Sequence, residues 1–253
     1  MKADWERVWE DNFDWNGGVD KNKWDFDNGG GGWGNQEQQF YTARNENARC
    51  ELFPNSANGR LIIEARKENF ENSRFTSARL KSKASWTYGR LQVRAKLPTG
   101  RGLWPAIWML PVAQSYGSQY WPDNGEIDVM EQVGFDPNRI VSSVHTKANN
   151  HMLNSQPTNG VQVSDATTNF KIYTLDWNVN KLEMFVGDEG NPLGQRILVW
   201  DKQNDWTKWP FDKPFFALLN IAVGGSWGGA KGIDEGIFPA RMEIDWVHYY
   251  QWR

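Results

Sequence analysis

The chain has 253 residues, a net charge of −3 and a pI near 5.7. This length allows one large β domain or two small ones, and either can bury a substantial core. The acidic balance and the lack of a basic patch argue against a nucleic-acid partner. No apolar run approaches the length of a membrane span, which argues against a membrane protein. The lone Cys50 excludes an internal disulfide and a cysteine-based metal cluster.

Short strands follow one another along the chain. Alternation of apolar and polar residues with a period of two predicts half-buried strands. The predicted strands are 60–66, 78–83, 90–97, 126–131, 139–147, 171–177, 181–186, 215–223 and 242–250. Four segments rich in Gly, Asn, Ser or Pro are predicted as long loops, at 27–34, 112–124, 148–169 and 188–213. No segment longer than two turns has a helical period, and no linker or repeat interrupts the chain. The pattern therefore favours a single all-β domain over residues 1–253, an antiparallel sandwich or jelly roll.

The predicted strand at 126–131 carries three carboxylates, Glu126, Asp128 and Glu131, among apolar residues. Buried acids are costly unless they are paired or used in chemistry. Glu126 and Asp128 share a face of a strand, whereas Glu131 points to the other face unless a β-bulge adds one residue. A bulge at Val129 or Met130 would place all three acids on one surface. The two glutamates could then approach the roughly 5 Å separation of retaining glycosidases. The alternative is that Glu131 faces away and forms a surface ion pair.

The composition includes 16 Trp, more than packing alone usually requires. A Trp ring offers a broad apolar plate with an N–H donor, which suits the C–H faces of sugars. We expect about half of these rings to be core and others to line a carbohydrate cleft. The three histidines, His145, His151 and His248, lack the spacing of a catalytic zinc site. No nucleophile elbow of a serine hydrolase is present.

Several motifs resemble those of bacterial-type laminarinases and related endo-β-glucanases of glycoside hydrolase family sixteen. They include Trp33–Thr42, Leu103–Pro111, the acidic strand, Leu219–Gly225 and Pro239–Tyr250. The E-I-D-x-x-E form of the acidic strand is similar to the laminarinase branch, whereas the lichenase branch lacks the extra residue. The resemblance covers nearly the whole chain.

The resemblance implies a β-jelly roll with a long groove on its concave sheet. It implies that Glu126 is the nucleophile, Asp128 its helper and Glu131 the general acid/base, with no catalytic cofactor. The implied substrate-binding residues are Asn35, Arg79, Trp104, Trp108, Trp121, His145, Asn220 and Trp227. It also implies a structural Ca²⁺ bound by the carbonyls of Asn12 and Gly59 and by the carboxylate of Asp245. For Trp108 and Asn220, core packing and a strand hydrogen bond remain the alternative.

The implied activity is endo-acting, retaining hydrolysis of β-1,3-glucan by a secreted monomer. Three alternatives stay open. The same chemistry could act on mixed-linkage glucan or a galactan, or transfer sugars in place of hydrolysis, or the chain could be a non-catalytic glucan-binding protein. The first residues of the chain contain no apolar signal region, so either the protein is cytosolic or a signal segment has been removed.

Overall fold

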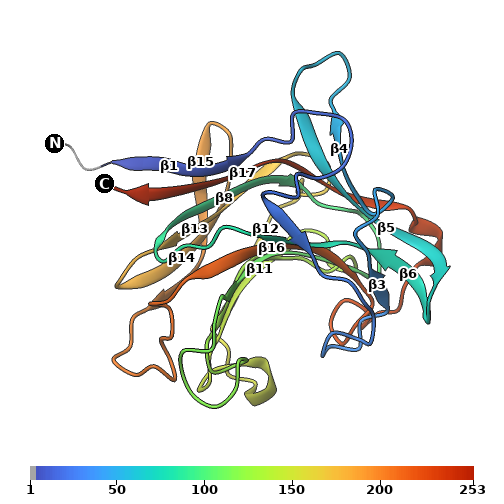
Figure 1. Ribbon diagram of the computed structural model, residues 1–253. Coiled ribbons are helices and arrows are strands. Elements are labelled where there is room, and N and C mark those ends of the chain that lie inside the picture. Colours follow the sequence, from blue (N-terminus) through green and yellow to red (C-terminus); the bar gives the residue numbers. More distant parts are fainter. Residues whose placement is uncertain (1–3) are drawn as a thin grey trace.

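The computed structural model describes residues 4–253 and shows two stacked β-sheets with no α-helix among these residues (Figure 1). The predicted all-β jelly-roll class is confirmed. Met1–Ala3, on which part of the signal-segment question depends, lie outside the described residues. No helix in the described part of the chain is long and apolar enough to cross a membrane.

The larger sheet has ten strands in the order β15-β14-β13-β8-β17-β5-β6-β3, with β1 paired to β17 and β4 to β5. Its strands are β1 (Trp5–Asp11), β3 (Gln39–Tyr41), β4 (Ala48–Leu52), β5 (Gly59–Phe70), β6 (Ser73–Ser77), β8 (Gly89–Lys96), β13 (Lys171–Trp177), β14 (Lys181–Asp188), β15 (Asn191–Asp201) and β17 (Ala240–Trp252). The long strand β17 pairs with β5 through its first half and with β1 through its second half, while β8 lies along its other side.

The smaller sheet has seven strands in the order β12-β11-β10-β9-β16-β7-β2. Its strands are β2 (Trp24–Phe26), β7 (Arg79–Ser82), β9 (Leu103–Pro111), β10 (Glu126–Glu131), β11 (Arg139–His145), β12 (Thr158–Gln162) and β16 (Phe215–Val223). Two 3₁₀ turns complete the described elements, η1 (His151–Leu153) and η2 (Glu235–Ile237).

The core lies between the two sheets, where each strand contributes every second residue. On β9, for example, Ile107 and Met109 are fully buried, while Trp104 and Trp108 face away from the core. About half of the tryptophans pack in or against this core, as predicted. They are Trp9, Trp15, Trp24, Trp86, Trp177, Trp200 and Trp209.

Two of the predicted loops are wrong in part. The segment 148–169 contains strand β12, and the segment 188–213 contains strand β15. Both strands lie at the edge of their sheets, where one side of the ladder is free. An edge position tolerates Gly160, Pro192 and Gly194, which are signals of loops in a sequence. The loops at 27–34 and 112–124 lie outside the named strands, as predicted.

Candidate active site

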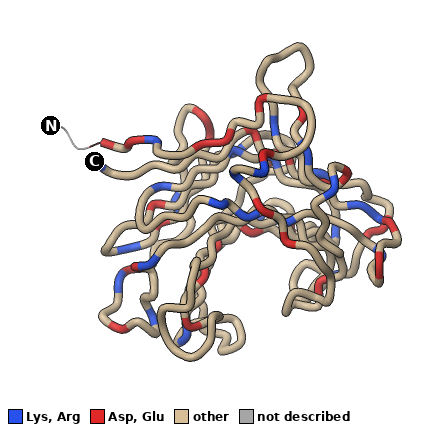
Figure 2. Tube along the Cα trace, in the orientation of Figure 1, with Lys and Arg blue, Asp and Glu red and all other residues tan. Residues whose placement is uncertain are grey.

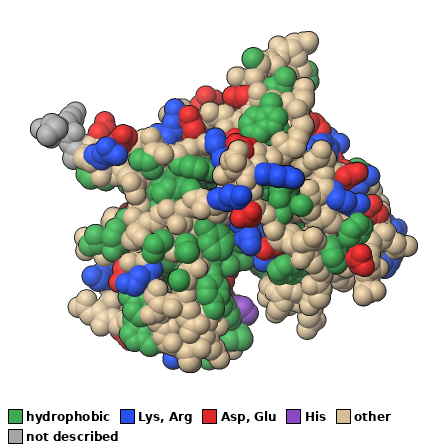
Figure 3. Space-filling model, viewed as in Figure 1, with side chains coloured by type: hydrophobic (Ala, Val, Ile, Leu, Met, Phe, Trp, Pro, Cys, Tyr) green, Lys and Arg blue, Asp and Glu red, His purple; other side chains and the backbone are tan. Residues whose placement is uncertain are grey.

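A groove with a volume of about 800 Å³ crosses the outer face of the seven-stranded sheet. Figure 3 shows the molecule hollowed on its lower side, with a histidine at the edge of the hollow. The three acids and all eight predicted substrate-binding residues line this groove, on β7, β9, β10, β11, β16 and the adjoining loops. These eight are Asn35, Arg79, Trp104, Trp108, Trp121, His145, Asn220 and Trp227.

Strand β10 contains the predicted bulge. Against β9, Asp128 pairs with Trp108 and Met130 with Ile107, so that Val129 is the extra residue. Against β11, the register also shifts between Asp128 and Glu131. Val129 and Met130 are both fully buried in the core. The extra residue therefore goes inward, and Glu131 returns to the groove face beside Glu126 and Asp128.

A buried hydroxyl group supports the bulge. The Ser142 hydroxyl donates a hydrogen bond of 2.7 Å to the carbonyl oxygen of Val129. Ser142 is itself fully buried on β11. A bulge disrupts the regular ladder, and an unpaired buried carbonyl costs free energy. The Ser142 hydroxyl gives the Val129 carbonyl a buried hydrogen-bond partner at the bulge.

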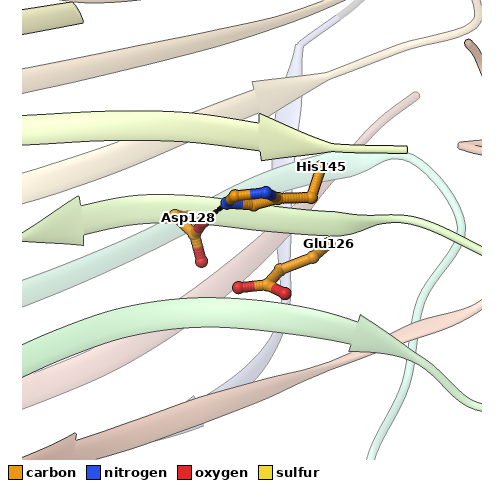
Figure 4. A group of neighbouring side chains, drawn as sticks. All are labelled: Glu126, Asp128 and His145. Carbon is orange, nitrogen blue, oxygen red and sulfur yellow. Dashed lines mark ion pairs between the residues drawn. The ribbon is translucent and has the colours of Figure 1, made fainter. Parts of the chain in front are cut away.

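Each acid has its own neighbour at the groove floor. The Trp121 indole donates to Glu126 Oε2 at 2.7 Å, and the Trp104 indole donates to Glu131 Oε1 at 3.1 Å. His145 Nε2 lies 3.1 Å from Asp128 Oδ2. Figure 4 shows Glu126 and Asp128 extending from the same side of β10, with His145 reaching Asp128 from β11.

Burial raises the pKa of all three carboxyl groups. For Glu131 the burial and the neighbouring charge of Glu126 raise the pKa to about 8. Burial and then Asp128 raise the pKa of Glu126 well above its ordinary value, while burial and then Glu131 do the same for Asp128. Asp128 is buried, and Glu126 and Glu131 are half-buried. Three carboxyl groups at this spacing cannot all ionise together, so the cluster titrates as a unit and holds protons at neutral pH.

The Trp121 N–H favours the ionised form of Glu126, because a donor stabilises a carboxylate. Asp128 is adjacent and can share a proton with Glu126. Glu131 stays protonated at neutral pH. The arrangement therefore offers one nucleophilic carboxylate and one carboxylic acid in the same groove, a combination suited to cleaving a glycosidic bond.

Comparison with known proteins identifies the family. Residues 32–248 match the model described as glycosyl hydrolases family 16. The chain belongs to glycosyl hydrolase family 16. It is 52% identical over 251 residues to a protein of Rhodothermus marinus named beta-glucanase. That alignment covers 98% of this chain and 86% of the relative.

Solved structures agree with this assignment. The laminarinase from Rhodothermus marinus superposes with a TM-score of 0.93 at 50% identity, covering all of both chains. SCLam, described as a non-specific endo-beta-1,3(4)-glucanase from the same family, superposes with a TM-score of 0.87 at 38% identity. That match covers 99% of this chain and 92% of the other.

In this member of the family, aromatic and amide side chains form the wall beyond the acids. The Trp108 indole donates to Asn220 Oδ1 at 2.7 Å, and Asn220 donates to the Tyr41 hydroxyl at 3.0 Å. The Arg79 guanidinium lies 4.2 Å from the centre of the Trp33 ring and pairs with Asp27 at 2.5 Å. Trp108 and Asn220 thus have both a structural bond and a face on the groove.

Sequence reasoning missed several groove residues, among them Glu37 and His151. Glu37 accepts hydrogen bonds from Asn35 at 3.0 Å and Gln39 at 2.9 Å, and burial raises its pKa. The His151 ring on η1 lies 5.2 Å from the Trp121 ring, measured between centres. The motif Trp33–Thr42 contains Glu37, so an acid within a recognised motif was an available signal. For His151 there was no signal, because its loop could not be placed from sequence.

Two separate groups of residues carry oxygen or nitrogen atoms that could bind a cation. Ligand atoms of Glu126, Asp128 and His145 lie within 4.8 Å of one another, but the chemistry above already uses these acids. The predicted calcium residues lie elsewhere: Gly59 on β5 and Asp245 on β17 belong to the ten-stranded sheet, and Asn12 directly follows β1. Asp14 and Gly59 are adjacent, because the Gly59 amide donates to Asp14 Oδ1 at 2.7 Å. Asp14 also lies near enough to Asp245 to help raise its pKa, after burial.

Proposed function

We propose that this protein is an endo-acting, retaining hydrolase of β-1,3-glucan. One observation carries the proposal: the bulge in β10 brings three carboxyl groups, one buried and two half-buried, together at the groove floor. Two similar proteins support the choice of substrate, since one is named a laminarinase and another an endo-beta-1,3(4)-glucanase. A protein that only binds glucan has no need of three such acids with raised pKa values.

The reaction has two displacement steps. Glu126 attacks the anomeric carbon while Glu131 donates its proton to the leaving glycosidic oxygen, which leaves a glycosyl ester on Glu126. Glu131, now a carboxylate, removes a proton from water, and the water oxygen attacks the anomeric carbon. The ester bond to Glu126 breaks, and the sugar keeps its original configuration. Asp128 shares a proton with Glu126 and so stabilises the carboxylate at the start and end of the cycle.

The groove walls hold the polymer. Trp104 and Trp227 pack edge to face with ring centres 5.6 Å apart, and both line the groove. Such plates contact the apolar faces of sugar rings, and the Asn35 and Arg79 side chains can bond the hydroxyl groups. Because the substrate is a polymer, we also propose that the enzyme acts outside the cell.

A second candidate substrate is mixed-linkage β-1,3-1,4-glucan, because SCLam is described as non-specific. The test is the release of reducing sugar from laminarin, lichenan and agarose in parallel. The proposal expects the highest kcat/KM on laminarin, and loss of turnover by several orders of magnitude in Glu126→Gln with the fold retained. Preference for agarose, or substantial turnover by Glu126→Gln, would contradict it.

We further propose that Asp245 and the carbonyls of Asn12 and Gly59 bind a structural Ca²⁺. Carboxylate and carbonyl oxygens suit this hard cation. The close approach of the segments that carry Asn12 and Gly59 supports this site. A Cβ on Gly59 would lie 2.1 Å from the carbonyl oxygen of Phe13, so only glycine lets the two backbones come this close. Asp245 Oδ2 bonds Arg94 at 2.5 Å, which leaves the other carboxylate oxygen for the ion. The ion would stabilise the fold and take no part in the reaction.

A further inference from the structure

A second, smaller cavity of about 400 Å³ lies on the ten-stranded sheet, on the face directed away from the core. Trp5 of β1 and Tyr250 of β17 contribute aromatic rings to it, and Pro192 and Leu193 of β15 form the opposite wall. Figure 1 shows β1, β15 and β17 close together at the upper left, away from the hollow at the bottom. We call this cavity the outer slot.

The start of β15 forms one wall of the outer slot. There β14 and β15 approach closely, because a Cβ on Gly187 would lie 2.1 Å from the Asn191 carbonyl oxygen. The register between β14 and β15 shifts at this point, between Val186 and Asp188. Residues 191–193 thereby reach the same cavity as Tyr250, although β14, β13 and β8 separate β15 from β17 within the sheet.

The Trp5 ring is held in place. The Arg90 guanidinium lies 4.5 Å from its centre, and Trp252 packs edge to face against it at 5.1 Å. Arg90 is fixed in turn by two hydrogen bonds to Asp176, of 2.6 and 2.7 Å. An indole ring that is already held from two sides loses little conformational entropy when a ligand stacks on it.

The polar groups of the slot indicate a neutral ligand. The charge of Arg90 is neutralised by Asp176, and the other polar groups on the side chains lining the slot are the amides of Gln92 and Asn191 and the hydroxyl of Tyr250. Gln92 donates to the Thr174 hydroxyl at 3.1 Å, which leaves its carbonyl oxygen as an acceptor. Amide groups and aromatic rings without net charge match hydroxyl groups and C–H faces, the two surfaces of a sugar.

We propose that the outer slot is a non-catalytic binding site for a β-glucan chain. The inference rests on the proposed function for the identity of the sugar, while its chemistry is independent of the acids. The slot and the groove lie on different sheets. A chain held at the slot therefore raises the local concentration of insoluble polymer without occupying the groove.

The experiment uses the Glu126→Gln protein, so that glucan is bound and not consumed. Trp5→Ala removes a plate, and Leu193→Trp fills the slot from the other wall without touching β1. Trp206→Ala is the matched control, because it removes a half-buried indole that lines neither the slot nor the groove. The bound fraction is measured by sedimentation with insoluble linear β-1,3-glucan, and thermal unfolding confirms that each variant is folded.

We expect Trp5→Ala and Leu193→Trp to weaken binding at least about fivefold, with Trp206→Ala unchanged. With Glu126 restored, both slot variants should hydrolyse a short soluble β-1,3-oligosaccharide at the normal rate and insoluble glucan more slowly. Unchanged binding in both variants, or an equal loss in Trp206→Ala, would overturn the assignment. Failure of the proposed function gives a different result, because the parent protein itself would then not cleave soluble laminarin.

Discussion

The role of Glu131 depends on the residues around its carboxyl group. A general acid must hold a proton, and burial together with Glu126 raises the pKa of Glu131 to about 8. The catalytically competent form is therefore present below this pKa and is lost as the pH rises through it. We expect kcat/KM to fall on the alkaline side with an apparent pKa near 8, and a pH profile on laminarin checks this.

Glu37 adds to this effect, because its charge also raises the pKa of Glu131. Glu37→Gln should move the alkaline limb of the kcat/KM profile to lower pH. Glu46→Gln, a change at an exposed acid, should leave the limb in place. A limb that moves to higher pH in Glu37→Gln would contradict the assigned electrostatic coupling.

Trp104→Phe should move the same limb in the opposite direction. The Trp104 N–H donates to Glu131 at 3.1 Å, and this hydrogen bond lowers the pKa of Glu131. Phe keeps an aromatic ring but has no donor, so the limb should move to higher pH. A stacking plate contributes about 1–3 kcal/mol of binding in the transition state, so kcat/KM should also fall. A large drop in Tm with unchanged kinetics would instead mark Trp104 as a core residue.

At the scale of elements, β10 depends on its neighbour β11. Ser142→Ala removes a buried hydrogen bond of 2.7 Å to the Val129 carbonyl oxygen at the bulge. We expect a loss of about 1–3 kcal/mol of unfolding free energy, measured by denaturant titration, and lower activity because the bulge positions Glu131. Ser143→Ala, which loses only a part-buried hydroxyl pair with Thr158, should be milder. Equal effects of the two changes would argue against a special role of Ser142.

The bulge in the acidic strand could be predicted, because the spacing of its three acids does not fit a regular strand. The odd spacing between Asp128 and Glu131 requires an extra residue if both acids face the groove, and the structure contains it. Strands β13 and β16 match their predicted ranges fully, since their residues alternate or are continuously apolar. Strands β12 and β15 were missed because their pairing comes from distant parts of the chain and not from local sequence.

At the scale of the whole molecule, the position of the groove depends on how the sheets stack and curve. The motifs indicated which residues reach the groove, but His151 and the outer slot depend on where loops and edge strands fold back in space. Charged residues are spread over both sheets, with Lys and Arg interspersed among Asp and Glu along the chain (Figure 2). This distribution suits a neutral polymer, which needs no charged surface.

The proposed calcium ion should affect the whole fold and not the reaction. An ion that binds only the native state raises stability by mass action, so a chelator should lower Tm. Activity measured well below Tm should be unchanged, because Asp245 lies on the ten-stranded sheet and the acids on the other. Asp245→Ala should have a lower Tm that no longer responds to chelator. A Tm that is insensitive to chelator in the parent protein would count against the site.

The central claim is that Glu126 and Glu131 act together in a double displacement on β-1,3-glucan. Proton NMR of the first product formed from laminarin tests it most directly, because the anomeric signal appears before mutarotation. The account predicts an initial β-anomer signal, since two inversions at the same carbon restore its configuration. An initial α-anomer signal would contradict both the retaining mechanism and the roles assigned to the two glutamates.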